Sequence, residues 1–313
     1  HAVLGAGGEW VVGATLAEAR RAAGKVQGRR TTEGLVWPVD VPAGDWVRTL
    51  QTTWVEPAYL EPDTAWCVPG GEPVGPLTNG GAFGGKTGLS EVAAAARRLA
   101  DEHGRPVVAS YTREDVVRRG PKRPPLAAGV RADGTGVVRV ARCAGIADAI
   151  RATAPGLVVE EVDVIGPPVS AALRAAGWAE AAVLLAPEDG WVTSPDGARA
   201  RAVVAADGAI EVELHCGAVL DEVVLRSYCV GAAHMAVSWV RSEGIAVGDD
   251  GVPRDLTMRS FGVVRAVDTP RIEVTLHDSD SEPVNGSDAV FAAVALAVWR
   301  ADGFPGRWPT MPT

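Results

Sequence analysis

The stretch GGAFGGKT at residues 80–87 places glycine, lysine and threonine where they could bind phosphate. It matches the pattern G-x-x-x-x-G-K-[ST], in which backbone N–H groups surround the phosphates and the lysine neutralises their charge. Gly80, Gly85, Lys86 and Thr87 occupy the required positions. A helix is predicted directly afterwards, over about residues 90–103. A nucleotide-binding protein is therefore one hypothesis for this chain.

The residues before this stretch argue against a nucleotide site. A phosphate-binding loop of this type directly follows a buried strand, because the strand fixes the direction of the N–H groups. Here the preceding residues are EPVGPLTN, and two prolines and a glycine do not make a central strand. The best candidate for an acidic strand end that could hold magnesium is LVVEEVD, ending at Asp163, which has two glutamates within it. A glycine-rich turn that only shapes the chain is a further alternative.

The elements that must position such residues are predicted from apolar periodicity and turn residues. At two places, a pair of segments with alternating apolar and polar residues is joined by an Asp-Gly turn, Asp133-Gly134 and Asp207-Gly208. This is a strong signal for a β-hairpin. Thr15 and Glu18 have the spacing of a capping box at a helix start. Further strands are predicted at 10–13, 46–62, 106–112, 157–166 and 272–276, and further helices at 169–186, 225–244 and 289–303.

This mixture of hairpins and helices predicts an α+β fold with mixed sheets and packed helices, rather than a regular βαβ array. The stretch PEDGWVTSPDG at 187–197 has the composition of a linker. We therefore expect two domains, residues 1–188 and 189–313.

Composition narrows the classes of function. The net charge of −9 disfavours a nucleic-acid partner, which needs clustered lysine and arginine. The sequence has neither a basic leader nor a run of about 20 apolar residues, so we expect no membrane segment and a cytoplasmic location. The four cysteines form no C-x-x-C pair, so we expect no metal site in this chain and thiols kept reduced.

The segment GGAFGGK resembles the G-G-G-F-G-G-K motif of the molybdenum-binding large subunit of the xanthine dehydrogenase, aldehyde oxidase and carbon monoxide dehydrogenase family. Other stretches resemble the same family in the same order, and the collinear match covers most of the chain. They are WVEPAYLEPDTAWCVPGG (54–71), GRPVVASYTREDVV (104–117), KRPPLAAGVRADGTGVVRV (122–140), GPPVSAALRAAGWAEAAVLL (166–185) and the segment 242–278. The resemblance implies two molybdopterin-binding-like domains, the first carrying the GGAFGGK loop.

The chain also departs from the family pattern. Family members are usually more than twice as long. Thr87 stands where the family has a glutamate, and residues 72–79 lack the glutamine that hydrogen-bonds a molybdenum oxygen. The Gly-Gln-Gly loop that holds the pterin pyrophosphate has no counterpart. Asp288 aligns with the catalytic glutamate of the family's G-V-G-E motif.

The resemblance implies roles for individual residues, each with an alternative. Asp288 is either the general base that deprotonates a metal-bound hydroxyl or the N-cap of a helix beginning at Ala289. Arg174 either stabilises a developing oxyanion or is a solvated helix residue. The cofactor-binding candidates could offer backbone N–H groups to an oxo ligand, or only form a tight glycine turn. They are Gly81, Phe83, Gly84 and Gly85.

These departures favour a shortened, structural subunit of a molybdenum hydroxylase complex with oxidoreductase activity. The expected partners are an iron–sulfur subunit, an FAD subunit and a full-length molybdenum subunit, with neither nucleic acid nor membrane. The alternative is a catalytic chain that hydroxylates an aldehyde, a purine or an N-heterocycle with Asp288 as base. It would then bind molybdopterin, with the cytosine dinucleotide form as one alternative; otherwise this chain holds no cofactor.

Overall fold

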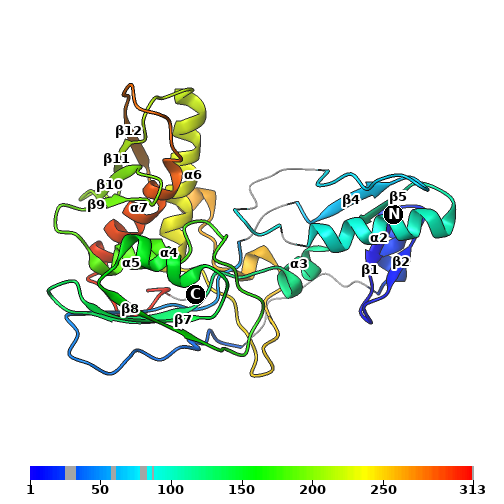
Figure 1. Cartoon of the computed structure of the whole chain (residues 1–313), viewed down its shortest axis with the longest axis horizontal. Coiled ribbons are helices and arrows are strands. Elements are labelled where there is room, and N and C mark those ends of the chain that lie inside the picture. Colours follow the sequence, from blue (N-terminus) through cyan, green and yellow to red (C-terminus); the bar gives the residue numbers. More distant parts are fainter. Residues whose placement is uncertain (25–32, 58–60, 78–82, 87, 312–313) are drawn as a thin grey trace.

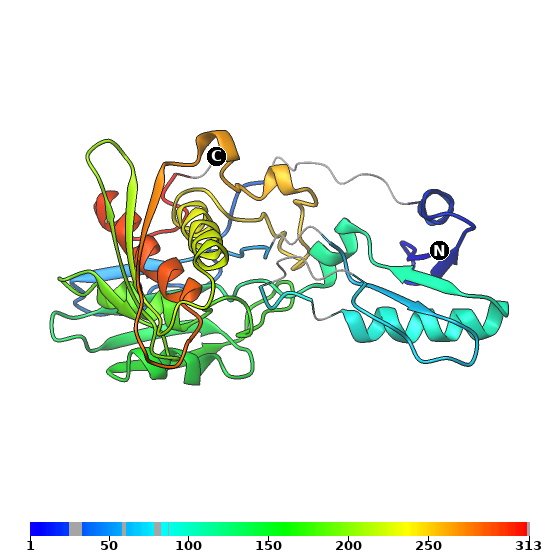
Figure 2. The same cartoon turned by 90° about the horizontal axis from the view of Figure 1, so that it is seen from above.

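The computed structural model describes residues 1–24, 33–57, 61–77, 83–86 and 88–311. Within them, twelve strands form three four-stranded sheets, accompanied by seven α-helices. The predicted mixture of helices and mixed sheets is confirmed. Figure 1 shows two lobes, and Figure 2 shows the same separation from above, with the N-terminus in the smaller lobe and the C-terminal end in the larger.

The smaller lobe is built on the sheet β2-β1-β5-β4, which pairs the N-terminal strands with strands from much later in the sequence. Its helix α2 buries Val92, Ala96 and Leu99 against this sheet. The predicted capping box of Thr15 and Glu18 is confirmed at the start of α1. The elements are β1 (Ala2–Leu4), β2 (Trp10–Val12), α1 (Leu16–Ala22), β4 (Thr64–Cys67), α2 (Leu89–His103), β5 (Val107–Ser110) and α3 (Arg113–Arg119).

The second sheet has the order β3-β6-β7-β8 and belongs to the larger lobe. β6 and β7 form the predicted hairpin, and Gly134 supplies the positive φ of +79° that its turn requires. β8 then pairs in parallel with β7 after the crossover helix α4. The elements are β3 (Arg48–Gln51), β6 (Leu126–Val130), β7 (Gly136–Ala141), α4 (Ile146–Thr153), β8 (Leu157–Val162) and α5 (Trp178–Leu185).

The third sheet has the order β12-β11-β10-β9. The hairpin of β10 and β11 turns at Asp207-Gly208 as predicted. β12 pairs in parallel with β11, with His215 opposite His277 at the end of the register. The elements are β9 (Trp191–Thr193), β10 (Arg199–Val204), β11 (Ile210–His215), α6 (Glu222–Arg241), the short 3₁₀ helices Met258–Ser260 and Ala266–Asp268, β12 (Ile272–His277) and α7 (Ser287–Ala301).

One hydrophobic cluster extends through the larger lobe, from Leu50 to Trp308. Helix α7 lies within it and is buried almost all round, and α6 packs alanines against α7. The smaller lobe has a core of its own around α2. The division of the chain between residues 188 and 189 stays a prediction; residues on both sides of that boundary belong to the same cluster.

Helix α6 is more apolar over its length than the sequence expectation of no membrane segment would suggest. Among the described residues it is the one helix whose length and apolar composition would suit a membrane crossing, and 44% of its most apolar window is buried within the structure. The buried helices of a protein core can have the same length and apolar composition, and the alanines of α6 are buried as in such a helix.

Two predicted elements are shorter than expected. The helix predicted at 169–186 begins only at Trp178, because Ala175 and Gly177 have φ values of +54° and +83° that interrupt a helix. The preceding residues form turns, which place Arg174 before α5 and not on its surface. The strand predicted over 46–62 is confined to Arg48–Gln51.

Candidate functional site

The loop containing Phe83 lies directly against the turn containing Arg174. The Arg174 backbone N–H donates a hydrogen bond to the Phe83 carbonyl oxygen at 3.1 Å. The Arg174 guanidinium carbon lies 4.5 Å from the centre of the Phe83 ring, which is a cation–π contact. Two stretches that are far apart in sequence are therefore joined through both backbone and side chain.

Gly84 makes this approach possible. Its φ is +84°, and a Cβ atom at this position would lie 2.0 Å from the carbonyl oxygen of Ala172. Any other residue would force the two backbones apart. Gly85 follows in the same loop and is buried, whereas Gly81 lies outside the described residues. In the described part of the loop, Gly84 therefore allows the backbone of the loop to pack closely against the backbone of residues 172–173.

The Arg174 side chain connects this loop to the start of α7. Its Nε lies 3.0 Å from Asp288 Oδ1, and its two terminal nitrogens donate to Ser287 Oγ and Met235 Sδ, each at 3.2 Å. The Arg174 side chain is only 10% exposed, so the interpretation as a solvated helix residue is wrong. Burial lowers the pKa of Arg174, and the charge of Asp288 offsets part of that effect.

The expectation that Asp288 caps a helix is also wrong. Helix α7 begins one residue earlier, at Ser287, and its N-cap residue is Gly286. Asn285 Oδ1 accepts hydrogen bonds from the backbone N–H and the hydroxyl of Ser287, at 3.1 and 2.9 Å. Asp288 stands in the first turn, where its carboxylate pairs with Arg174. Its role as a general base stays a prediction.

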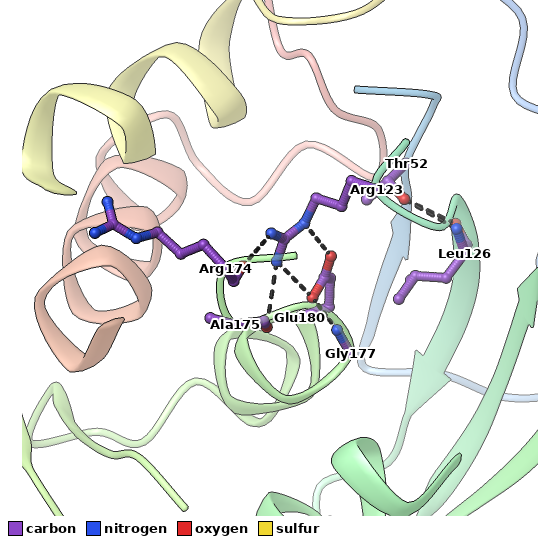
Figure 3. Close-up of polar contacts among 7 residues, drawn as sticks. All are labelled: Thr52, Arg123, Leu126, Arg174, Ala175, Gly177 and Glu180. Carbon is purple, nitrogen blue, oxygen red and sulfur yellow. Dashed lines mark hydrogen bonds and ion pairs between the residues drawn. The ribbon is translucent and has the colours of Figure 1, made fainter. Parts of the chain in front are cut away.

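A second buried arginine, Arg123, holds the turn that carries Arg174. Its guanidinium forms a two-point pair with Glu180 at 2.6 and 2.9 Å and donates to the Arg174 carbonyl oxygen at 2.6 Å. Figure 3 shows this pair, with the Arg174 side chain extending away from it. The guanidinium also lies 4.0 Å from the Trp239 ring centre. Sequence reasoning did not single out this pair; its one signal is a glutamate inside the apolar helix WAEAAVLL.

A cavity lies where these segments meet. Phe83 and Arg174 line it together with Trp239, Glu243 and Phe291, and most of its wall is apolar. Its volume is about 40 Å³. A cavity that admits benzene has about 150 Å³, and one water needs at least about 10–15 Å³. The cavity therefore has room for a molecule of only a few heavy atoms.

Glu243 was not predicted as a site residue. It follows the end of α6, is 9% exposed and lines the cavity. Burial raises the pKa of its carboxyl from the usual 4.5 to about 8, against smaller opposing effects of Arg123 and of a hydrogen bond with Ser238. At neutral pH this carboxyl is therefore largely protonated. The sequence SEGI carries no sign of such burial.

The cavity beside Phe83 does not fit molybdopterin. Pockets for ligands of that size have volumes of about 300–1,000 Å³, whereas this cavity is far smaller. The backbone of residues 172–174 occupies the space beside Phe83 and Gly84, and the Arg174 guanidinium is already paired. Within the part of the chain that the structure describes, no three His, Cys, Asp or Glu side chains are grouped as metal ligands.

The geometry around Lys86 differs from that of a nucleotide-binding loop. Between β4 and the described part of the loop, residues 68–77 contain only an isolated bridge from Val74 to Trp66 and no strand. Asp163 follows β8, and its Oδ1 accepts from Arg142 Nε at 2.8 Å. The strand that should precede the glycines is therefore absent from the described residues, which disfavours the nucleotide hypothesis.

No protein-family model and no curated protein matches this sequence. Partial similarity to solved oxidoreductase structures exists. Quinoline 2-oxidoreductase from Pseudomonas putida 86 is 11% identical, covering 60% of this chain and 37% of that one with a TM-score of 0.30. CO dehydrogenase from Oligotropha carboxidovorans is 11% identical, covering 57% and 34% with a TM-score of 0.29. Aldehyde oxidoreductase from Desulfovibrio gigas is 15% identical, covering 61% and 35% with a TM-score of 0.26.

The part of each solved chain that is matched is little more than a third of its length. At these TM-scores the likeness to molybdenum hydroxylase chains is weak and partial, and no residue role is taken from it.

Proposed function

We propose that this chain is a shortened, non-catalytic subunit of a molybdenum hydroxylase-like oxidoreductase complex. The observation that supports this most is the meeting of three segments. The GGAFGGK loop, the LRAAG turn and the start of α7 all resemble family stretches, and Phe83, Arg174 and Asp288 bring them into contact. The fold thus keeps together the segments that would surround a cofactor.

The same contacts support a structural role for these residues. The Arg174 guanidinium forms an ion pair with Asp288 and lies over the ring of Phe83. It therefore offers no free positive charge to a developing oxyanion. Asp288 already holds the Arg174 guanidinium through Oδ1, so as a general base it would have to act from within this ion pair. The small cavity adds a steric limit. These residues therefore stabilise the fold in our proposal, and a partner chain carries the metal.

Isolation of the chain from its native host, under conditions that preserve complexes, tests the proposed subunit role. The tagged chain should co-purify with an iron–sulfur protein and an FAD protein in fixed ratios, and the eluate should show flavin and iron–sulfur absorption. A tagged unrelated protein from the same cells serves as the control. Recovery of the chain as a monomer free of flavoprotein and iron–sulfur protein would contradict the proposal.

A further inference from the structure

The cavity beside Phe83 contains one acidic group whose charge is not balanced. Three other charged side chains line its wall, and each has a partner. Arg123 pairs with Glu180, Arg174 pairs with Asp288, and Glu56 lies 2.9 Å from Lys122 with both side chains fully buried. Among the described residues, no cation lies within ion-pair distance of Glu243. The protonated form avoids the cost of a buried, unpaired carboxylate.

This pattern of charges favours a neutral occupant. An anion loses its hydration when it is buried, and only an unpaired positive charge nearby would offset that cost. Both arginines on the cavity wall are already paired with carboxylates. A cation would meet two guanidinium groups of the same charge, Arg123 and Arg174, which already cover the Trp239 and Phe83 rings. A small neutral molecule meets neither cost.

A protonated carboxyl presents one O–H donor and one carbonyl acceptor side by side. An amide presents the complementary pair, a carbonyl oxygen and an N–H on the same edge. We propose that the cavity is a binding site for a small neutral amide of about three or four heavy atoms, held by two hydrogen bonds to Glu243 and by contacts with Phe83 and Trp239. This site is independent of the proposed subunit role.

The assignment fixes the pH dependence of binding. Glu243 binds the amide in its protonated form, so affinity should be constant below pH 7 and should fall as the pH rises through about 8. The groups facing Glu243 are Arg123 and Ser238, and the other charged residues on the cavity wall are Arg174 and Glu56. Arg123 and Arg174 are arginines held in ion pairs, and Glu56 pairs with Lys122, whose pKa is lowered by burial. The Glu243→Gln variant therefore separates the titration of Glu243 from that of Lys122.

Formamide is a suitable probe because it has three heavy atoms and the required edge. The upper limit on binding energy per heavy atom restricts a ligand of this size to a dissociation constant of roughly 1 mM or weaker. Methyl-¹³C methionine NMR can report binding of that strength. The chain has three methionines, and Met235 lines the cavity while Met258 and Met311 do not.

In the full chain at pH 6.5, formamide should shift the Met235 methyl signal in a saturable way and leave the Met311 signal unmoved. Formate, which has the same size and a negative charge, should not compete. At pH 9.5 the formamide response should be reduced at least tenfold. Glu243→Gln keeps a donor and an acceptor but does not ionise, so its response should persist at pH 9.5. Glu211→Gln, on an exposed strand position, should behave like the wild type.

Three outcomes would overturn the proposal. An unmoved Met235 signal at saturating formamide would show that the cavity is not a site for this class. Equal competition by formate would exclude a preference for neutral ligands. A wild-type response that persists unchanged to pH 9.5 would show that Glu243 does not hold the ligand. This measurement uses the wild-type chain, so misfolding of a variant cannot affect it.

Discussion

Arg174 is a cation that the fold has taken almost completely out of water. Burying such a group is costly unless a carboxylate and further acceptors surround it. Asp288, Ser287 and Met235 supply these contacts, and the ring of Phe83 covers the guanidinium plane. The burial of Arg174 thus gives Asp288 a structural role as its counter-charge, while the helix-cap role is excluded because Gly286 is the N-cap.

This explanation predicts the stability of two Asp288 variants. Asp288→Ala should lower the free energy of unfolding by about 2 kcal/mol, because Arg174 is left buried without its counter-charge; the loss is below the value for a fully buried pair because Asp288 is a quarter exposed. Asp288→Asn should cost about 1 kcal/mol, since it keeps an acceptor and loses the charge. Chemical denaturation of purified protein measures both.

Asp148→Asn is the matched control for that series. Asp148 also stands in the first turn of a helix, but it is exposed and pairs only with Arg151 at the surface. Its loss should cost about 0.5 kcal/mol, the usual size of an exposed ion pair within one helix. If Asp288→Asn lowered the free energy of unfolding no more than Asp148→Asn, the ion pair with Arg174 would not stabilise the fold as we expect.

At the level of single residues, sequence reasoning found Phe83, Gly84, Arg174 and Asp288, and the structure brings these four together. It gave Asp288 and Arg174 the wrong surroundings because both assignments depended on helix starts, which local patterns place only within a few residues. Glu243 was missed for a different reason. Its burial results from segments around Trp54 and Phe261 that pack beside it, and no local pattern records this.

At the level of elements, the loop of residues 83–86 and the turn of residues 172–177 act as one unit. Positive φ values at Phe83, Gly84, Ala175 and Gly177 shape both segments so that their backbones can touch. The Arg123–Glu180 pair fixes the turn from behind, since Glu180 Oε2 also accepts from the Gly177 N–H at 2.9 Å. The contact between loop and turn therefore depends on glycine at position 84.

Gly84→Ala should separate the loop from the turn. The added Cβ would collide with a backbone oxygen that cannot move aside cheaply, so the Arg174 N–H should lose its hydrogen bond to Phe83. Hydrogen exchange of the Arg174 amide should become faster by at least about tenfold. Gly104→Ala is the control, because Gly104 has φ +62° and nothing within 4 Å of its Cβ position. It should cost about 1 kcal/mol through backbone strain and leave Arg174 exchange unchanged. Equal exchange in the two variants would contradict the close-contact explanation.

The hairpins were predictable as elements because Asp133-Gly134 and Asp207-Gly208 determine a turn within a few residues. The parallel pairing of β11 with β12 was not, since about sixty residues separate the strands and no local signal specifies the partner. The same holds for β1 and β5, which bring the N-terminus into the smaller lobe. Sequence patterns thus gave the local pieces and the fold class, and left the arrangement of sheets open.

In the whole molecule, segments from three parts of the chain meet around Phe83, Arg174 and Asp288, and the cavity beside them is too small for molybdopterin. The two lobes have separate hydrophobic cores, so a partner could bind one without disturbing the packing of the other. The proposed complex assigns the metal chemistry to another chain and gives this one a structural role.

Molybdenum content tests that claim most directly. The chain is purified from its native host with partners attached, the complex is separated into subunits under mild conditions, and each fraction is analysed for molybdenum and for released pterin. We expect molybdenum and pterin to remain with a partner subunit and this chain to retain almost none. One molybdenum atom bound per copy of this chain, together with one pterin, would show that it carries the cofactor itself and would contradict the account.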